Sequence, residues 1–446
     1  MASAKEIQNR KVNARLYPIY KMISWDLLFY YSIIYLFLTQ AKGFSASQVL
    51  LAEAAFTSMC LIIQIPIGIL VEKIGKKRSL VFANVCMCLF TIGLIFLKTY
   101  TQLFVAYFLD SVGYVIKCVC ETNILYDSLP KGKKRGSLYS TLDGLGASRY
   151  YMVDAVTSLI AGYAFVISPY LPIVLCLIGN IISTILASRF KHTQMPDDDV
   201  EEKTSVKEYL WQLKNAVRFT KKSKRIACLL IFFGLTSGLI YNMTTFRSGI
   251  LEQIELPAQY FGLVFAISQV AASLCSRMQN LIQKRYKNTT LTHLGIPLTV
   301  SCIIIGVLAL GKISNIKTYI IIALFILQGA IKGVYNVLIY RYLNNFTTKQ
   351  IRTKLATVRN IVYNLFSIAI SLLGSALLQF SNASTAIIIV GISMTIVMIL
   401  LLDYINSIGN SNKIISREII SNDESLENSS TSVNENSIAE VDGGSD

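Results

Sequence analysis

Ionisable side chains occur inside long apolar stretches of this chain, where a charge is costly unless it is paired or functional. The N-terminal part holds more such acids than bases. A buried carboxylic acid can bind and release a proton as its access to water changes. We expect Asp26 and Glu53 to exchange protons in this way. The full set comprises six acids and two bases, namely Asp26, Glu53, Asp110, Glu121, Asp143 and Asp154 with Lys117 and Arg149.

The spacing of these residues arranges them in stripes along helices. An i, i+7, i+11 spacing brings side chains onto one face. One stripe consists of Asp110, Lys117 and Glu121 and is expected to face a cavity. A second stripe, on the next apolar run, consists of Asp143, Tyr150 and Asp154. Arg149 points about 120° away from the second stripe and is expected to pair with a neighbouring helix. The alternative is that these groups form buried ion pairs that serve stability alone.

The C-terminal part carries polar groups of a different kind. Lys332 and Arg359 are basic, and Gln328, Lys332 and Asn336 are spaced by four on one predicted helix, while Tyr241 and Asn242 lie on another. Amide and cationic groups of this kind can bind a polar or anionic solute. Alternatively, Lys332 neutralises an acid of the N-terminal part.

The elements that position these residues are predicted to be membrane-spanning helices. Of 446 residues, 53% are hydrophobic and 15% are charged, and the apolar runs are about 20 residues long, enough to cross a bilayer core. The fold class expected is an all-α integral membrane protein of twelve helices in two pseudo-symmetric bundles of six. The predicted spans are 17–39, 46–70, 80–97, 101–126, 137–163, 167–188, 226–246, 257–281, 292–310, 318–342, 352–378 and 384–404.

The polar segments between the spans predict domains and orientation. Residues 1–188 and 226–405 would be the two bundles, 189–225 a cytoplasmic linker with an amphipathic helix and 406–446 a disordered cytoplasmic tail. The capping-box spacing of Ser205 with Glu208 and one apolar face favour a helix on the inner membrane surface or under the bundle, or alternatively a solvated helical connector. Basic residues, Lys21 among them, concentrate in alternate loops, which predicts a plasma-membrane protein with both termini cytoplasmic. The opposite side carries only Lys42, Lys98, Arg247, Lys312 and Lys317. The net charge of +16 therefore reports orientation rather than nucleic-acid binding.

A short loop after the second span combines glycines with charges. It reads Gly-Ile-Leu-Val-Glu-Lys-Ile-Gly-Lys-Lys-Arg over residues 68–78. Gly68 is expected to let helices approach closely and Gly75 to permit a backbone reversal. The charges can form ion pairs that hold the inner helix ends together.

This loop resembles the signature loop of the major facilitator superfamily, Gly-x-Leu-x-Asp-Arg-x-Gly-Arg-Lys. Identical residues and conservative replacements match it at Gly68, Leu70, Glu72, Lys73, Gly75, Lys76 and Lys77. The resemblance implies that Glu72 faces the start of the eleventh helix and that a loop base pairs with Asp127. It also implies a gate that controls opening at the cytoplasmic side. The family's fourth-helix arginine and the proline of the drug-exporter fifth helix are missing here.

The resemblance further implies a secondary transporter working by alternating access, in which two halves rock about a central site. We expect proton-coupled efflux of drug-like or amphiphilic compounds, with uptake of a sugar or organic anion as the alternative, favoured if Lys332 or Arg359 lines the cavity. A membrane enzyme or receptor is the remote alternative, since no catalytic cluster is apparent. The expected partners are a small-molecule substrate, protons and the bilayer, with no cofactor, metal or nucleic acid, and the expected state is a monomer.

Overall fold

A computed structural model describes residues 4–130, 135–192, 224–278, 290–345 and 349–407, together with the single positions 214, 218, 282, 285 and 286. Every element within these residues is helical. Apart from the single positions 214 and 218, the predicted linker helix lies outside the described residues, as does almost all of the predicted tail. The side chains of Glu72 and Asn336 do so as well.

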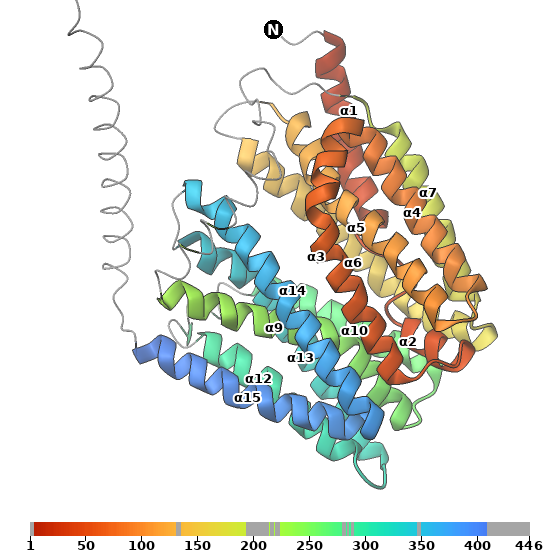
Figure 1. Cartoon of the computed structure of the whole chain (residues 1–446), viewed down its shortest axis with the longest axis vertical. Helices are drawn as coiled ribbons and strands as arrows, with labels where there is room; N and C mark the ends of the chain where they lie inside the picture. Colours follow the sequence, from red (N-terminus) through yellow and green to blue (C-terminus); the bar gives the residue numbers. More distant parts are fainter. Residues whose placement is uncertain are drawn as a thin grey trace, which may run out of the picture.

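The first bundle, called here the N-terminal bundle, is built from the helices before the linker (Figure 1). Two of them begin with a capping box, Ser45 with Gln48 and Thr99 with Gln102, so their first turns have bonded donors. The helices are α1 (Ala4–Ser24), α2 (Ile34–Leu36), the π-helical turn η1 (Phe37–Ala41), α3 (Ala46–Ile74), α4 (Lys76–Phe96), α5 (Tyr100–Ser128), α6 (Arg135–Ile167) and α7 (Leu171–Arg189).

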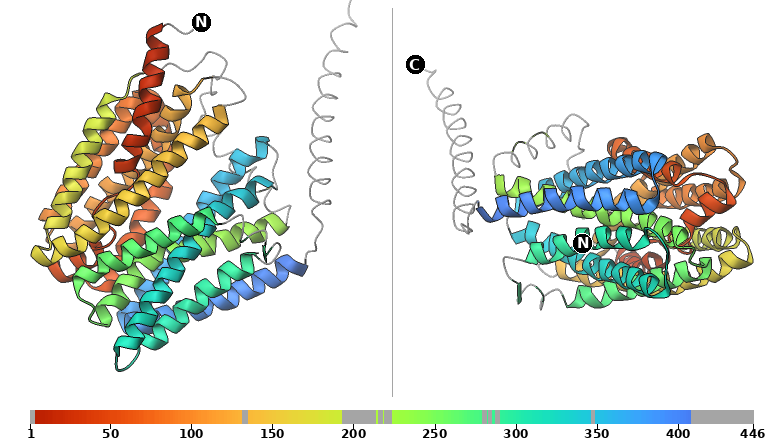
Figure 2. Two further views of the ribbon diagram at one scale, coloured as in Figure 1. Left: turned by 180° about the vertical axis from the view of Figure 1, so that it is seen from behind. Right: turned by 90° about the horizontal axis from the view of Figure 1, so that it is seen from below.

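The second bundle, called the C-terminal bundle, follows the linker. It consists of α9 (Lys224–Gln253), α10 (Ala258–Arg277), α12 (Thr290–Ala309), α13 (Asn315–Asn345), α14 (Lys349–Phe380) and α15 (Ala383–Ser407). Figures 1 and 2 show the two bundles diverging toward the end where the N-terminus lies. At the opposite end they are packed together.

Eleven described helices are long and apolar enough to cross a membrane, so the predicted count of twelve is not confirmed. The difference lies in the predicted span 17–39. Figure 1 places α1 and α2 toward opposite ends of the N-terminal bundle, so this segment covers the height of its neighbours in pieces rather than as one helix.

The break after α1 has a local cause. The Asp26 carboxylate accepts hydrogen bonds from the Leu27 backbone N–H (2.9 Å) and the Tyr31 hydroxyl (2.7 Å), and such local bonds compete with helix formation. Phe29 then adopts a φ of +61°, which reverses the chain. Lys117 Nζ of α5 donates to the Ser24 carbonyl, one of the acceptors left free where the helix ends.

The two bundles meet along α3 with α14 and α6 with α10, a contact that we call the seam. Near one end of the seam, the hydroxyls of Ser47 and Ser375 lie 3.0 Å apart, and each also donates to the other's carbonyl. Gly162 and Gly262 let α6 and α10 cross backbone to backbone, because a Cβ on Gly262 would lie 2.2 Å from the Ser158 carbonyl oxygen. Neither Gly162 nor Gly262 can be replaced by a larger residue without a shift of the facing backbone.

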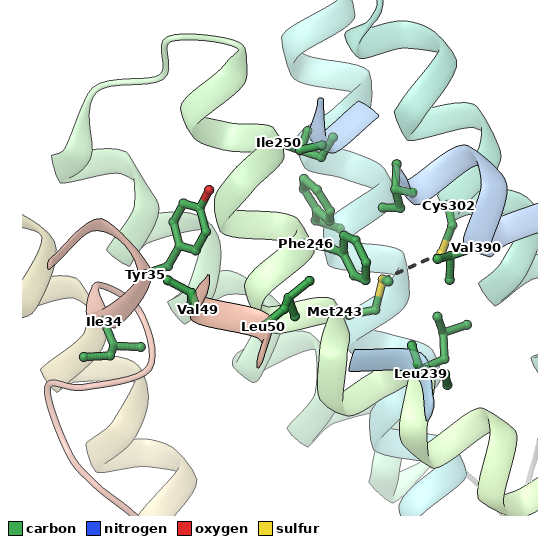
Figure 3. Close-up of a cluster of buried hydrophobic side chains, with 14 of the residues drawn as sticks. Ile34, Tyr35, Val49, Leu50, Leu239, Met243, Phe246, Ile250, Cys302 and Val390 are labelled. Carbon is green, nitrogen blue, oxygen red and sulfur yellow. Dashed lines mark hydrogen bonds between the residues drawn. The ribbon is translucent and has the colours of Figure 1, made fainter. Parts of the chain in front are cut away.

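A buried apolar cluster continues across this end of the seam (Figure 3). Leu50 of α3 lies with Phe246 of α9, and Tyr35 of α2 packs near Gly249. The Cys302 thiol contacts the Met243 sulfur at 3.6 Å deeper in the C-terminal bundle. Burial of this apolar surface stabilises the seam in the packed arrangement.

Candidate functional site

A pocket opens in the C-terminal bundle beside the seam. Four helices line it, α9, α10, α12 and α13. Its polar residues are Thr244, Arg247, Ser268, Gln269, Gln328 and Lys332. Its apolar walls include Ile240, Met243, Phe265, Leu298 and Phe325. A concave site with a few convergent polar groups on apolar walls is the usual form of a small-molecule site.

Two cations, Arg247 and Lys332, line this pocket. The Arg247 guanidinium stacks over the ring of Phe265, 4.3 Å from its centroid. Lys332 lies one turn beyond Gln328 on α13, and the Gln328 amide donates to the Ser301 hydroxyl at 2.9 Å. The predicted stripe of Gln328 and Lys332 therefore does line a pocket, with Asn336 outside the described side chains.

An acid of the N-terminal bundle reaches the edge of this pocket. The Gln269 amide donates to the Asp154 carboxylate at 2.9 Å, and this bond crosses the seam from α10 to α6. The field of Asp154 also reaches Arg247 and Lys332. The sequence placed Asp154 on a functional stripe but gave no partner for it.

A second acid is bonded across the seam on the other flank. The Thr245 hydroxyl of α9 donates to the Glu53 carboxylate of α3. Glu53 and Asp154 are thus carboxylates of one bundle that accept hydrogen bonds from neutral donors of the other. Such bonds must break if the seam opens.

The acids and base on α5 are arranged differently from the prediction. Asp110, Lys117 and Glu121 are buried and none of them lines the pocket, while Lys117 donates to the Ser24 carbonyl at the end of α1. The Ser24 hydroxyl lies 3.5 Å from the Glu121 carboxylate. The field of Lys117 reaches Asp110 and Glu121, so the stripe neutralises itself in part and supports the broken helix.

Asp143 forms an ion pair within the N-terminal bundle. Its carboxylate binds Lys21 Nζ and accepts a 2.8 Å hydrogen bond from the Tyr17 hydroxyl, one helical turn away on α1. Lys21 was assigned to a basic cytoplasmic segment, but it is buried and lies over the Trp25 ring. The structure therefore favours a structural role for Asp143.

Single substitutions in this pair should destabilise the protein more than the double substitution does. Lys21→Met or Asp143→Asn leaves one partly buried charge without its partner, and we expect a loss of about 1–3 kcal/mol. The double variant should recover part of this loss, which thermal unfolding in detergent would measure. Equal, additive losses would argue against a coupled pair.

Other predicted residues are placed away from the pocket. Asn242 is buried and fixes α9 to α14, because its amide donates to the Gly238 and Ser367 carbonyls and its oxygen accepts from Ser371. The Arg359 guanidinium binds the neighbouring Asn360 side chain, at 2.8 Å. Arg149 is exposed, and the predicted ion pair is absent among the described residues.

Tyr241 lies at the seam rather than in the pocket. Its ring meets that of Tyr363 of α14 edge to face at 6.4 Å, and its hydroxyl lies within the field of Glu53 of the N-terminal bundle. The Asp26 carboxylate, which accepts hydrogen bonds from Leu27 and Tyr31, also lies within the electrostatic field of Lys332. Among the described residues Lys332 forms no direct ion pair with an acid of the N-terminal bundle, so its predicted neutralising role stays a prediction.

The loop between α3 and α4 shows the expected reversal and one expected pair. Gly75 has a φ of +91°, which side chains rarely adopt. Lys76 Nζ contacts the buried Asp127 carboxylate of α5 at 2.8 Å. The close approach predicted at Gly68 is wrong as far as the described residues show, since none of their atoms lies within 4 Å of a Cβ placed there. Leu70 and Lys73 are exposed.

Lys76 and Lys77 offer a matched test of this loop. Lys76→Met should leave Asp127 buried without its cation. Lys77→Met removes a neighbouring charge that has no ion-pair partner among the described residues, and it should cost less than about 0.5 kcal/mol. We expect hydrogen exchange over residues 71–80 to accelerate only in Lys76→Met. Equal acceleration in both variants would show that net charge, not the pair, holds the loop.

Three residues were not predicted from the sequence: Arg247 and Gln269, which line the pocket, and Thr245, which bonds to Glu53 across the seam. Arg247 was assigned to the side opposite the basic loops because the span was predicted to end at residue 246. The helix continues to Gln253, which places Arg247 inside it. The apolar residues Ile250 and Leu251, which follow Arg247 beyond a short predicted span, were the signal available.

The sequence matches the Major Facilitator Superfamily over residues 19–313, about two thirds of the chain. The chain belongs to this family. Major Facilitator Superfamily membership confirms the resemblance seen in the loop and places the chain among transporters of small solutes rather than enzymes. No curated protein matches the sequence.

Solved structures of Major Facilitator Superfamily transporters share the fold. A variant of the nucleoside transporter NupG superimposes with a TM-score of 0.70 at 14% identity, covering 89% of this chain and 99% of NupG. A POT family transporter in complex with a thioalcohol-conjugated peptide gives 0.65 at 12% identity, covering 91% and 96%. A bacterial homolog of the human lysosomal transporter Spinster gives 0.61 at 10% identity, covering 91% and 96%.

Proposed function

We propose that this Major Facilitator Superfamily chain is a proton-coupled secondary transporter that exposes its pocket alternately on two sides of a plasma membrane. The observation that carries the proposal is the pair of seam carboxylates. Glu53 and Asp154 each accept a hydrogen bond from the opposite bundle. Because the bundles must separate there for the seam to open, a proton that binds either acid alters the opening directly.

The proposed orientation puts the diverging ends of the bundles in the cytoplasm. The basic loop of Lys73, Lys76, Lys77 and Arg78 lies at that end, and short cytoplasmic loops are rich in Lys and Arg. The packed seam then faces outward, so the described arrangement is an inward-facing one. Both termini are cytoplasmic in this proposal, and one chain is sufficient for transport.

Two directions of transport are supported by different residues. Lys332 lines the pocket. A basic residue in this position favours uptake of a nutrient such as a sugar or organic anion. The apolar walls formed by Phe265, Leu298 and Phe325 favour instead the efflux of amphiphilic compounds. We propose uptake as the first candidate, because a cation in an apolar pocket needs a polar solute to be stabilised.

Flux into right-side-out vesicles under an imposed inward proton gradient tests both parts. A panel of labelled organic acids, sugars and lipophilic dyes should contain a solute that accumulates against its gradient and stops accumulating when a protonophore is added. Dye extrusion that depends on the gradient would instead support efflux. Transport that is indifferent to the gradient for every solute would contradict proton coupling.

A further inference from the structure

The pocket holds two positive charges that have no direct counter-ion among the described residues. Arg247 and Lys332 both line it, and neither forms an ion pair with a described carboxylate. Like charges that line one pocket repel each other. Inside a membrane protein such charges are costly unless something balances them.

The nearby acids do not supply that balance by contact. Asp154 interacts with both cations at a distance, but its carboxylate accepts the Gln269 amide. Asp26 interacts with Lys332 in the same way, while its carboxylate is bonded to Leu27 and Tyr31. No described residue accepts a hydrogen bond from, or forms an ion pair with, either cation, so their donors are available to another acceptor.

The setting of Arg247 suits recognition of a planar anion. Phe265 covers one face of the guanidinium, and stacking of this kind leaves the N–H edge available for hydrogen bonds. An arginine edge can bind a carboxylate through two parallel hydrogen bonds, and a lysine can add a point charge beside it. The apolar walls of Leu298 and Phe325 can then contact a small hydrocarbon body.

We propose that this pocket binds organic acids with a small apolar body, and that Arg247 and Lys332 bind the carboxylate. The inference rests on the proposed transport function, whose substrate class it names. The bound carboxylate replaces the missing counter-ion, so binding is coupled to relief of the repulsion between the two cations. A solute of the same shape without the negative charge gains none of this stabilisation.

Titration calorimetry of the purified full chain in nanodiscs of phosphatidylcholine tests the inference. The probes are benzoate and hexanoate, with benzamide and hexanamide as uncharged counterparts. We expect each acid to bind about tenfold or more tightly than its amide, as charge-assisted hydrogen bonds imply. Equal affinity of acid and amide, or no binding of either acid, would overturn the inference.

Variants connect the charge preference to the pocket. The double variant Arg247→Gln with Lys332→Gln should reduce benzoate affinity to that of benzamide. The single variant Arg247→Lys should keep part of the preference for benzoate over benzamide, because lysine retains the charge but cannot form two parallel hydrogen bonds. Lys317→Gln on the same α13 helix is the matched control and should bind benzoate as the wild type does. Retention of full benzoate affinity by the double glutamine variant would contradict the assignment.

Two further measurements, binding in nanodiscs with anionic lipid and proton-driven transport, separate this inference from related explanations. Nanodiscs that contain phosphatidylglycerol should not abolish benzoate binding, and abolition would identify the pocket as a site for anionic lipid headgroups instead. If the acids fail to bind while another solute is still driven by protons, the substrate class is wrong and the proposed function stands. If they bind but no solute is transported, the proposed function fails alone.

Discussion

Replacing Gly262 by alanine is expected to open the seam. The added Cβ would lie 2.2 Å from the Ser158 carbonyl oxygen and 3.1 Å from the Gly162 nitrogen, so the α6 backbone would have to move. Overpacking of this kind costs about 1–3 kcal/mol, which shifts the balance between the two openings roughly 5- to 150-fold. Transport should slow because the carrier must visit both openings.

Spin labels at Lys98 and Lys312, both exposed at the seam end of their bundles, would measure this shift in a cysteine-free background. The distance between the labels should lengthen in Gly262→Ala. Gly144→Ala on α6 is the control, since its Cβ would meet nothing within 4 Å, and it should leave the distance unchanged. Unchanged distances in both variants would show that this crossing does not limit the opening.

Replacing Glu53 by glutamine is expected to uncouple transport from protons. Glutamine can still accept the Thr245 hydrogen bond, so the seam can still form, but it cannot bind a proton. A proton that no longer binds cannot favour either opening, and the accumulation ratio in vesicles should fall to about 1. Exchange of labelled for unlabelled solute, which needs no proton gradient, should continue.

Glu252→Gln provides the control for this substitution. Glu252 also bonds across the bundles, to the Gln40 amide at 3.0 Å, but it does so at the end of α9 near the membrane surface. It should retain accumulation. Loss of accumulation in both variants would indicate that any weakened seam bond abolishes coupling, and intact accumulation in Glu53→Gln would remove Glu53 from the proton pathway.

Local patterns in the sequence predicted the features that depend on few residues. The apolar runs predicted eleven of the helices, and the loop around Gly75 predicted a reversal that the backbone makes with positive φ. A pair between a loop base and Asp127 was likewise expected from the motif. The break after Ser24 was missed because Asp26 and Tyr31 end the helix within a run that remains apolar.

The pocket could not be predicted because it depends on which faces of four helices meet. Lys332 and Gln328 were chosen by their spacing, but Arg247 and Gln269 come from helices whose relative rotation no local pattern specifies. The same limit explains the error at Gly68. A glycine marks a close approach only where another helix lies beside it, as at Gly262.

Alternating access about the seam is the central claim, and a reversible cross-link tests it most directly. Ser47→Cys with Ser375→Cys, in a background without the nine native cysteines, places two thiols where hydroxyls lie 3.0 Å apart. Oxidation should form the disulfide, hold the seam closed and reduce transport to background, and reduction should restore it. Undiminished transport by fully cross-linked protein would contradict the claim.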